Sequence, residues 1–300
     1  MSLRTPWCRS MGVDMPIVNA PMGGAAGGRL AAAVSRAGGL GMVGMGSAGT
    51  ADQLTAELQA FTSYLGADLD RPFGIGLVHW VAEARPELLT RALAARPALL
   101  CVSFGEDSSW VSRAHEAGVV AATQVATVAA ALRAVDAGVD VLVARGAEGG
   151  GHGEPRVGTL ALLADVLDRV DVPVLAAGGI ASARGLAAVL AAGASAAWLG
   201  TVFAACPEAS TGAAARAAML AAGGEATTLT RAFDIDNGYP WPEHLPERVL
   251  TDSAGMPTPV DAGQGVGMVN RAVPAADLIA GLCGDAEALL GRWVSAGGAG

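Results

Sequence analysis

Short apolar runs rich in valine, leucine and alanine alternate along the chain with longer stretches in which apolar residues recur at helical spacing. Apolar runs bounded by glycine are typical of buried strands, whereas an apolar residue at every third or fourth position predicts an amphipathic helix. The runs predict strands over residues 16–20, 39–43, 73–78, 98–104, 119–124, 139–144, 172–177 and 196–203. The stretches between them predict helices over residues 28–37, 51–65, 86–95, 110–117, 126–137, 160–169 and 183–192.

Four of the returns from helix to strand share one local signal, an Ala-Gly pair that ends the helix. Its glycines stand where a left-handed helix cap is expected, at Gly38, Gly118, Gly138 and Gly193. Strands that alternate with helices predict parallel βα units, which fit either an open doubly wound sheet or a closed barrel. Eight near-equal units favour the barrel, and no Gly-x-Gly-x-x-Gly follows the first strand. We therefore predict an α/β fold, a (β/α)8 TIM barrel.

The alternation stops after Ala222. Residues 224–275 contain several prolines and few regular signals, and a segment of this kind is usually a functional lid or a wrap around the domain. A closing helix is predicted over residues 275–294. We predict one domain over residues 1–300, with a barrel core over 14–223 and a C-terminal excursion with its closing helix over 224–300.

Composition and charge exclude several classes of protein. A hydrophobic fraction of 52% supports a large core, and the net charge of −9 opposes nucleic acid as a partner, because phosphate binding needs a basic face. No apolar run reaches the ~18 residues that span a bilayer, and the N-terminus lacks the apolar core of a signal peptide. The four cysteines form no CxxC pair, so neither a metal site nor a disulfide framework is indicated. We expect a cytoplasmic protein without membrane contact.

The sequence contains no lysine. All 19 basic residues are therefore arginines, which excludes mechanisms that need an amine nucleophile, such as Schiff-base aldolases and pyridoxal phosphate enzymes.

The stretch RGAEGGGHGEP, Arg145 to Pro155, is the strongest candidate for chemistry. It follows a predicted strand, so in a barrel it lies at the mouth, where ligand-binding loops gather. Its glycines let backbone approach a ligand closely, and His152 can move protons near neutral pH. Read alone, the stretch is equally consistent with a flexible turn and a solvated histidine.

Glycines at the ends of other predicted strands favour a ligand-binding loop over a flexible turn. Gly178-Gly179 and Gly200-Thr201 follow the seventh and eighth strands, where barrels commonly hold a phosphate. Ser182 is a candidate helix N-cap beside them. Few carboxylates or basic residues occur in these loops, so a phosphorylated planar cofactor fits better than a sugar phosphate. We expect flavin mononucleotide (FMN), which would carry the redox chemistry itself.

Four segments resemble the nitronate monooxygenase family: PIVNAPMGG from Pro16, AEGGGHG from Ala147, PVLAAGGI from Pro173 and WLGT from Trp198. The segment GQGVG from Gly263 resembles the family less strongly. The resemblance implies a TIM barrel that binds FMN non-covalently and oxidises alkyl nitronates, or nitroalkanes, with O2 to a carbonyl compound and nitrite. The reactants would be a small-molecule substrate and O2, and the sequence leaves open whether the chain forms a homo-oligomer.

The resemblance also implies residue roles. His152 would be the catalytic histidine, and no metal is implied. The cofactor-binding residues would be Met22 and Gly23 against the ring and ribityl chain, Gln124 at the pyrimidine edge, Gly150 and Gly151 along the flavin, and Gly178, Gly179, Gly200 and Thr201 at the phosphate. Many members have alanine where this chain has Gly149, and several have an asparagine-containing end to strand three, which here reads FGIGLVHW from Phe73.

Other assignments stay open at this stage. An NAD(P)H-dependent FMN enoyl-thioester reductase would share the glycine-histidine loop, and a non-catalytic flavin-binding barrel is the alternative of another class. Whether His79, Trp80 or Trp241 lines the pocket is undecided, and Glu148 is expected to hold the loop rather than act on substrate. An IMP-dehydrogenase-type barrel needs a nucleophilic cysteine in a glycine-rich loop, and neither Cys101 nor Cys206 suits that role.

Overall fold

A closed barrel of parallel strands forms the centre of the protein. The computed structural model describes residues 3–66 and 70–296. The barrel strands are hydrogen-bonded in the order β1-β9-β8-β6-β5-β4-β3-β2. Their bounds are Ile17–Asn19 (β1), Gly41–Met45 (β2), Phe73–Val78 (β3), Leu99–Ser103 (β4), Val120–Val125 (β5), Val141–Arg145 (β6), Val174–Ala177 (β8) and Ala196–Leu199 (β9). A parallel bridge between Val18 and Leu40 joins the two ends of this sheet. The predicted TIM barrel is confirmed.

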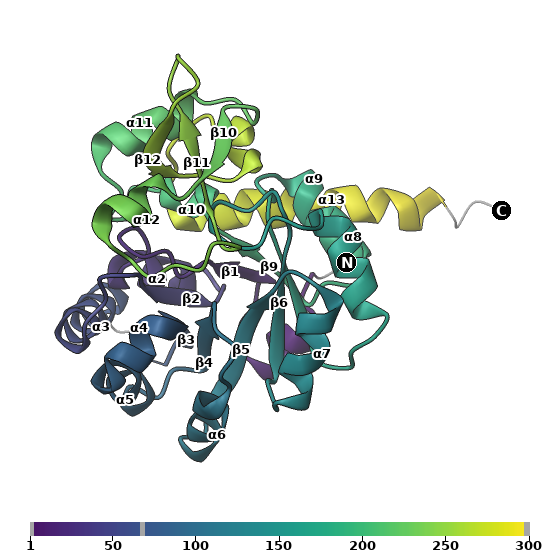
Figure 1. The fold of residues 1–300 in the computed structure, drawn as a ribbon. Coiled ribbons are helices and arrows are strands. Elements are labelled where there is room, and N and C mark those ends of the chain that lie inside the picture. The colour runs from purple at the N-terminus through teal and green to yellow at the C-terminus, as the bar shows by residue number, and fades with distance from the viewer. Residues whose placement is uncertain (1–2, 67–69, 297–300) are drawn as a thin grey trace.

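Helices surround the barrel and connect its strands (Figure 1). They are α2 (Gly28–Arg36), α3 (Ala51–Leu65), α4 (His79–Ala84), α5 (Pro86–Ala94), α6 (Ser109–Glu116), α7 (Val128–Asp136), α8 (Thr159–Leu167), α9 (Ala183–Ala191), α10 (Thr201–Ala204) and α11 (Ala213–Ala221). Side chains cap several of them, and Ser182 accepts a hydrogen bond from the backbone of Gly185 as predicted. The four Ala-Gly helix ends also have the expected conformation, with positive φ at each glycine.

Alternate residues of each strand fill the barrel interior. Val18, Met42, Cys101, Ala122, Val143, Leu175 and Trp198 belong to one buried cluster. Because side chains of a strand alternate between its faces, residues two positions further along point the same way. On β4, β5 and β6 these residues are Ser103, Gln124 and Arg145, and all three line the mouth of the barrel. The fold therefore places polar side chains in the last layer above an apolar interior.

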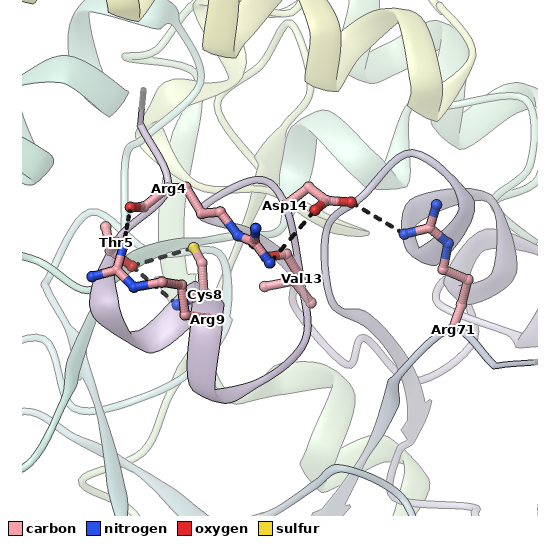
Figure 2. A network of polar contacts seen from close by, with 7 residues as sticks. All are labelled: Arg4, Thr5, Cys8, Arg9, Val13, Asp14 and Arg71. Atoms are coloured by element: carbon pink, nitrogen blue, oxygen red, sulfur yellow. Dashed lines mark hydrogen bonds and ion pairs between the residues drawn. The ribbon is translucent and has the colours of Figure 1, made fainter. Parts of the chain in front are cut away.

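A short N-terminal helix, α1 (Pro6–Ser10), closes the opposite end of the barrel. Trp7 and Cys8 are buried in the same cluster as the interior strand residues. Figure 2 shows the polar contacts around this helix: Arg4 donates to the carbonyl of Val13, and Asp14 lies between Arg4 and Arg71. These exposed ion pairs hold the N-terminus in place and contribute little stability.

The segment after α11 is more regular than its sequence predicts. Strands β10 (Thr227–Thr230), β11 (Glu247–Thr251) and β12 (Pro257–Asp261) form a small antiparallel sheet beside the barrel (Figure 1). A two-residue strand, β7 (Gly151–His152), pairs with β11 and so joins the predicted glycine-histidine loop to this sheet. Proline in β12 and a register irregularity between β11 and β12 hide the alternation that would have predicted these strands.

The chain returns to the barrel through a short helix η1 (Gln264–Met268) and a long helix α13 (Ala275–Ala296). The helix α12 (Ala232–Asn237) lies earlier in the same segment. Ile279, Leu282 and Cys283 of α13 are buried in the main hydrophobic core, which confirms the predicted closing helix. Within the described residues, no helix has the length and hydropathy needed to cross a membrane.

The contact between α2 and α3 depends on the absence of a side chain at Gly28. A Cβ atom there would lie 1.9 Å from the carbonyl oxygen of Glu57. Gly28→Ala should therefore lower the free energy of unfolding by about 1–3 kcal/mol, measured by urea denaturation. Gly281→Ala is the control: a Cβ at this exposed helical position meets nothing within 4 Å, and should raise stability by about 0.5–1 kcal/mol. Equal effects of the two substitutions would contradict this account of the helix contact.

Candidate active site

A cavity of about 790 Å³ lies at the mouth of the barrel, where the strands end in loops. The small antiparallel sheet and the segment around α12 cover one side of it (Figure 1). Every residue that the sequence singled out for the site lines this cavity: Met22, Gly23, Gln124, Gly150, Gly151, His152, Gly178, Gly179, Gly200 and Thr201. Residues far apart in the sequence are thus brought together in one place.

The glycine-histidine loop is wound around a buried arginine. Arg145, at the end of β6, is 5% exposed, and its Nη2 donates to the carbonyl oxygens of Gly149, Gly150 and Gly151 at 2.8, 3.2 and 3.0 Å. A Cβ on Gly149 would lie 2.7 Å from Nε, and one on Gly153 would lie 2.4 Å from Cζ. The loop therefore needs glycine at these positions to make room for the guanidinium group.

The opposite side of the loop is also held by side chains. Arg248 of β11 donates to the carbonyl of Ala147. Glu148 accepts hydrogen bonds from the backbone and the hydroxyl of Thr159, at 2.9 Å each. Glu148 thus contacts the start of α8, in keeping with its expected role in holding the loop.

His152 is fixed by two residues of the C-terminal segment. Its Nε2 lies 2.9 Å from Oδ2 of Asp234, and both side chains are largely buried. The imidazole stacks on the ring of Trp241 at a centroid distance of 3.6 Å and an interplanar angle of 7°. A carboxylate can only accept here, so Nε2 carries the hydrogen and the neutral ring has Nδ1 as its basic nitrogen. Histidine is therefore held in one orientation and one tautomer.

Aromatic side chains form the wall beside the histidine. The Trp241 indole donates to the Ser47 hydroxyl at 3.0 Å and packs edge-on against Phe104 and Trp80. Trp241 and Phe104 line the cavity, whereas Trp80 lies behind Trp241 and is outside the lining. His79 is also outside it and pairs with Glu83. Of the three residues that the sequence left undecided, Trp241 therefore lines the cavity, whereas His79 and Trp80 do not.

Close backbone contacts shape the floor of the cavity. A Cβ on Gly23 would lie 2.5 Å from Cα of Gly46, and a Cβ on Gly150 would lie 2.5 Å from the backbone nitrogen of Gly263. Glycine at these positions keeps two pairs of loops in contact and leaves their backbone open to a ligand.

The ends of β8 and β9 form another part of the lining. Gly178 and Gly179 have φ values of +112° and +67°, which favour glycine. The hydroxyl of Thr201 accepts a hydrogen bond from the backbone of Gly263 at 3.0 Å, and Gly265 packs against the carbonyl of Gly179. The GQGVG segment therefore supports both strand ends that the sequence assigned to a phosphate.

Three acidic residues of the C-terminal segment face the same cavity as His152: Asp234, Glu247 and Asp261. Burial raises the pKa of Glu247 to about 8, and the neighbouring carboxylates of Asp261 and Asp234 act in the same direction. The enclosed position of Asp261 raises its pKa as well, although its surface opens into the cavity. Since the Glu247 carboxyl is hydrogen-bonded to Asp261, this pair shares a proton near neutral pH.

Sulfur chemistry is not supported at this site. Cys101 lines the cavity, but burial raises the pKa of its thiol to about 12, and the same cause raises the pKa of Cys206 to about 12. A thiolate nucleophile is therefore disfavoured at both positions.

Sequence reasoning missed several residues that complete the site. Asp234, Glu247 and Asp261 come from the segment that was expected to be irregular, and Arg145 was noted only as the start of the loop. Asp234 is separated from His152 by 82 positions, so no local pattern links them. A charged residue directly at the end of a predicted strand, as Arg145 is, was the one available signal.

A barrel with a buried, carboxylate-bound histidine at its glycine-lined mouth is the architecture of a cofactor-dependent enzyme. Comparison with known proteins is more specific. The family model for nitronate monooxygenase matches residues 5–88 and 83–239. The chain belongs to the nitronate monooxygenase family, and it is a flavin-dependent oxidoreductase.

Relatives carry more than one activity in their names. A nitronate monooxygenase of Pseudomonas aeruginosa is 33% identical over 299 residues, covering 84% of this chain and 82% of that protein. A (3aS,4S,5R,7aS)-5-hydroxy-7a-methyl-1-oxo-octahydro-1H-indene-4-carboxyl-CoA dehydrogenase of Mycobacterium tuberculosis is 35% identical over 255 residues, covering 83% and 67%. For the dehydrogenase of the same name from Rhodococcus jostii, the match spans 66% of its length.

Two solved structures are similar to this chain over nearly its whole length. FabK from Thermotoga maritima has a TM-score of 0.85 at 26% identity, covering 97% of this chain and 99% of its own. A nitroalkane oxidase from Streptomyces ansochromogenes has a TM-score of 0.81 at 29% identity, covering 95% and 99%. Both structures therefore share the fold of this chain over nearly its whole length.

The raised pKa of Glu247 predicts a pH dependence of stability. Because folding raises this pKa from 4.5 to about 8, the contribution of the carboxyl group is fully present below pH 4.5 and is lost as pH rises through about 8. Glu247→Gln removes the titration. Between about pH 5 and about pH 9 the wild type should lose at least about 1 kcal/mol relative to the variant, measured by urea denaturation.

Glu243→Gln is the matched control for this measurement. The Glu243 side chain is 89% exposed, so its removal should leave a pH profile parallel to that of the wild type. A Glu247→Gln profile that also runs parallel to the wild type would contradict the assignment.

Proposed function

We propose that this protein binds FMN in the barrel-mouth cavity and oxidises alkyl nitronates with O2 to a carbonyl compound and nitrite. One observation carries the proposal: a histidine with a fixed tautomer faces a glycine-lined cavity of about 790 Å³ in a member of the nitronate monooxygenase family. Ligand cavities of this kind commonly measure ~300–1,000 Å³. The absence of a side chain at Gly23 and Gly150 lets the loops of the cavity floor pack closely against each other.

The lining residues suggest how FMN would be held. Met22 and Gly23 would lie along the ring and ribityl chain, and Gln124 would lie at the pyrimidine edge. Gly150 and Gly151 would line the flavin. Backbone N–H groups near Gly178, Gly179, Gly200 and Thr201 would hold the phosphate, because barrels commonly bind phosphate at these two strand ends. Bound FMN supplies the electron transfer from the substrate and the reaction with O2.

His152 would handle the proton and the charge of the substrate. With its Nε2 hydrogen committed to Asp234, Nδ1 is free to accept a proton from the carbon of a neutral nitroalkane. For a nitronate anion that proton transfer is unnecessary, and the protonated ring would bind the nitro oxygens. Asp234 stabilises the imidazolium form in both cases, and Trp241 excludes water from one face of the ring.

A second function is favoured by specific relatives. The likeness to FabK and to two carboxyl-CoA dehydrogenases supports an NAD(P)H-dependent reductase that acts on enoyl thioesters. Anaerobic reduction of bound flavin by NADPH within seconds would favour this function over nitronate oxidation. A non-catalytic flavin-binding barrel is disfavoured, because the buried His152–Asp234 pair is a costly arrangement to keep without a reaction.

Cofactor binding is tested by the absorption spectrum of the purified protein. We expect bands near ~370 and ~450 nm from oxidised flavin, and release of FMN rather than FAD on denaturation. Gly150→Val is expected to abolish the bands, because its side chain would occupy the space against Gly263. A colourless protein that takes up no added FMN would refute the proposal.

Histidine chemistry is tested by steady-state oxygen consumption with a nitronate and with its parent nitroalkane. His152→Ala should lower kcat/KM for the nitroalkane by about 10²–10⁴-fold, because the proton acceptor is lost, while FMN remains bound. It should also lower kcat/KM for the nitronate, because the ring that would bind the nitro oxygens is lost. Asp234→Asn should lower it less, by about tenfold or more, because the ring loses its orienting carboxylate. His115→Ala is the control: this exposed histidine pairs with Asp140 at the surface, and its loss should leave turnover unchanged. Unchanged turnover in His152→Ala would remove the residue from the mechanism.

A further inference from the structure

Arg145 is a buried cation that forms no direct ion pair within the described part of the chain. The guanidinium group is 5% exposed, and no described carboxylate lies within 4.0 Å of it. Its hydrogen bonds are made by Nη2 to three neutral carbonyl groups. Burial lowers the pKa of Arg145 to about 10, and Arg248 acts in the same direction, while the charges of Asp261 and Glu148 oppose this shift. Burying a charge without an opposite charge is costly.

One face of the same group has no protein partner. Nη1 of Arg145 is buried, makes no hydrogen bond within the described residues, and belongs to a side chain that lines the cavity. Arg145 also stands in the inward-facing layer of the barrel mouth, at the end of β6, where it pairs with Ala177 of β8. Nη1 is therefore a buried, unpaired donor beside Gly153, on a side chain that lines the cavity.

Arg248 of β11, a second buried arginine that contacts this loop, differs from Arg145 in its hydrogen bonds and in its position relative to the cavity. Arg248 donates through Nε and Nη2 to the carbonyl of Ala147, and through Nη1 to the hydroxyl of Thr227. It is outside the cavity lining. All three guanidinium nitrogens of Arg248 therefore have hydrogen-bond partners in the protein. Nη1 of Arg145 has none among the described residues.

We propose that Nη1 of Arg145 pairs with a negatively charged part of the bound flavin nucleotide and thereby favours the reduced cofactor. This inference rests on the proposed FMN binding. Reduction of FMN by two electrons and one proton leaves one additional negative charge on the ring. A fixed cation beside the ring stabilises that charge, because protein groups around it screen the interaction less than water does. The phosphate group is the other anion of the same ligand, and the position of Arg145 in the inward-facing layer favours the ring.

The test compares FMN affinity and reduction potential in the wild type and in Arg145→Gln. The variant should weaken the binding of reduced FMN at least tenfold more than that of oxidised FMN. For a two-electron couple this equals a fall of about 30 mV in the potential of the bound cofactor. Arg248→Gln removes an equal charge and a loop contact from outside the cavity, and should leave the ratio of the two affinities unchanged.

Riboflavin separates the two anionic groups of the ligand. If Arg145 binds the phosphate instead, Arg145→Gln weakens FMN at least tenfold in both redox states and leaves riboflavin affinity unchanged, which would overturn the preference for the reduced cofactor. If the ring is the partner, both ligands weaken equally. Identical affinities and potentials in Arg145→Gln and Arg248→Gln would overturn the inference and leave Arg145 as a loop support.

If Arg145→Gln does not fold, Arg145→Lys replaces it in the measurement of the reduction potential. A buried amine loses its proton in alkaline buffer, so the potential of its bound FMN should fall there more steeply than that of the wild type. A slope equal to that of the wild type would count against the charge pair. A protein that binds FMN but does not oxidise nitronates would refute the proposed reaction and leave these measurements valid.

Discussion

The hydrogen bonds between one guanidinium group and three successive glycine carbonyls organise the mouth of this barrel. Arg145 draws these carbonyls inward, so the peptide N–H groups that follow them point away from it. The same loop then pairs as β7 with β11, and this ladder places His152 directly opposite Glu247. Loss of the arginine would therefore disturb the loop, the histidine and the attachment of the covering sheet together.

Charge is distributed unevenly around the cavity. The barrel strands contribute the cation Arg145, whereas the covering segment contributes Asp234, Glu247 and Asp261. A proton shared between Glu247 and Asp261 reduces the negative charge on that side near neutral pH. His152 lies between the two sides and is bonded to Asp234. This arrangement suits a reaction in which an anionic substrate and a charged cofactor must approach each other.

The names of the relatives describe more than one reaction, whereas the barrel fold is common to the solved structures. A flavin held at a barrel mouth can pass electrons to O2 or exchange them with a nicotinamide cofactor, so the barrel alone does not select between them. The covering segment supplies Asp234, Trp241 and the aromatic wall with Phe104. We expect selection between substrates to depend on this covering segment, because loops and covering segments tolerate change better than the strands beneath them.

The sequence by itself determined the barrel and the strand-end residues of the candidate site. Strand and helix periods are local, the Ala-Gly caps need only a positive φ, and a parallel barrel brings all strand ends to one mouth. The sequence alone could therefore assign His152, Gly178 and Thr201 to the same candidate site. The tertiary structure alone decided the partners of these residues. Asp234, Trp241 and Glu247 reach the site from a segment of short strands and prolines, and contacts across about 80 or more positions leave no periodic trace in the sequence.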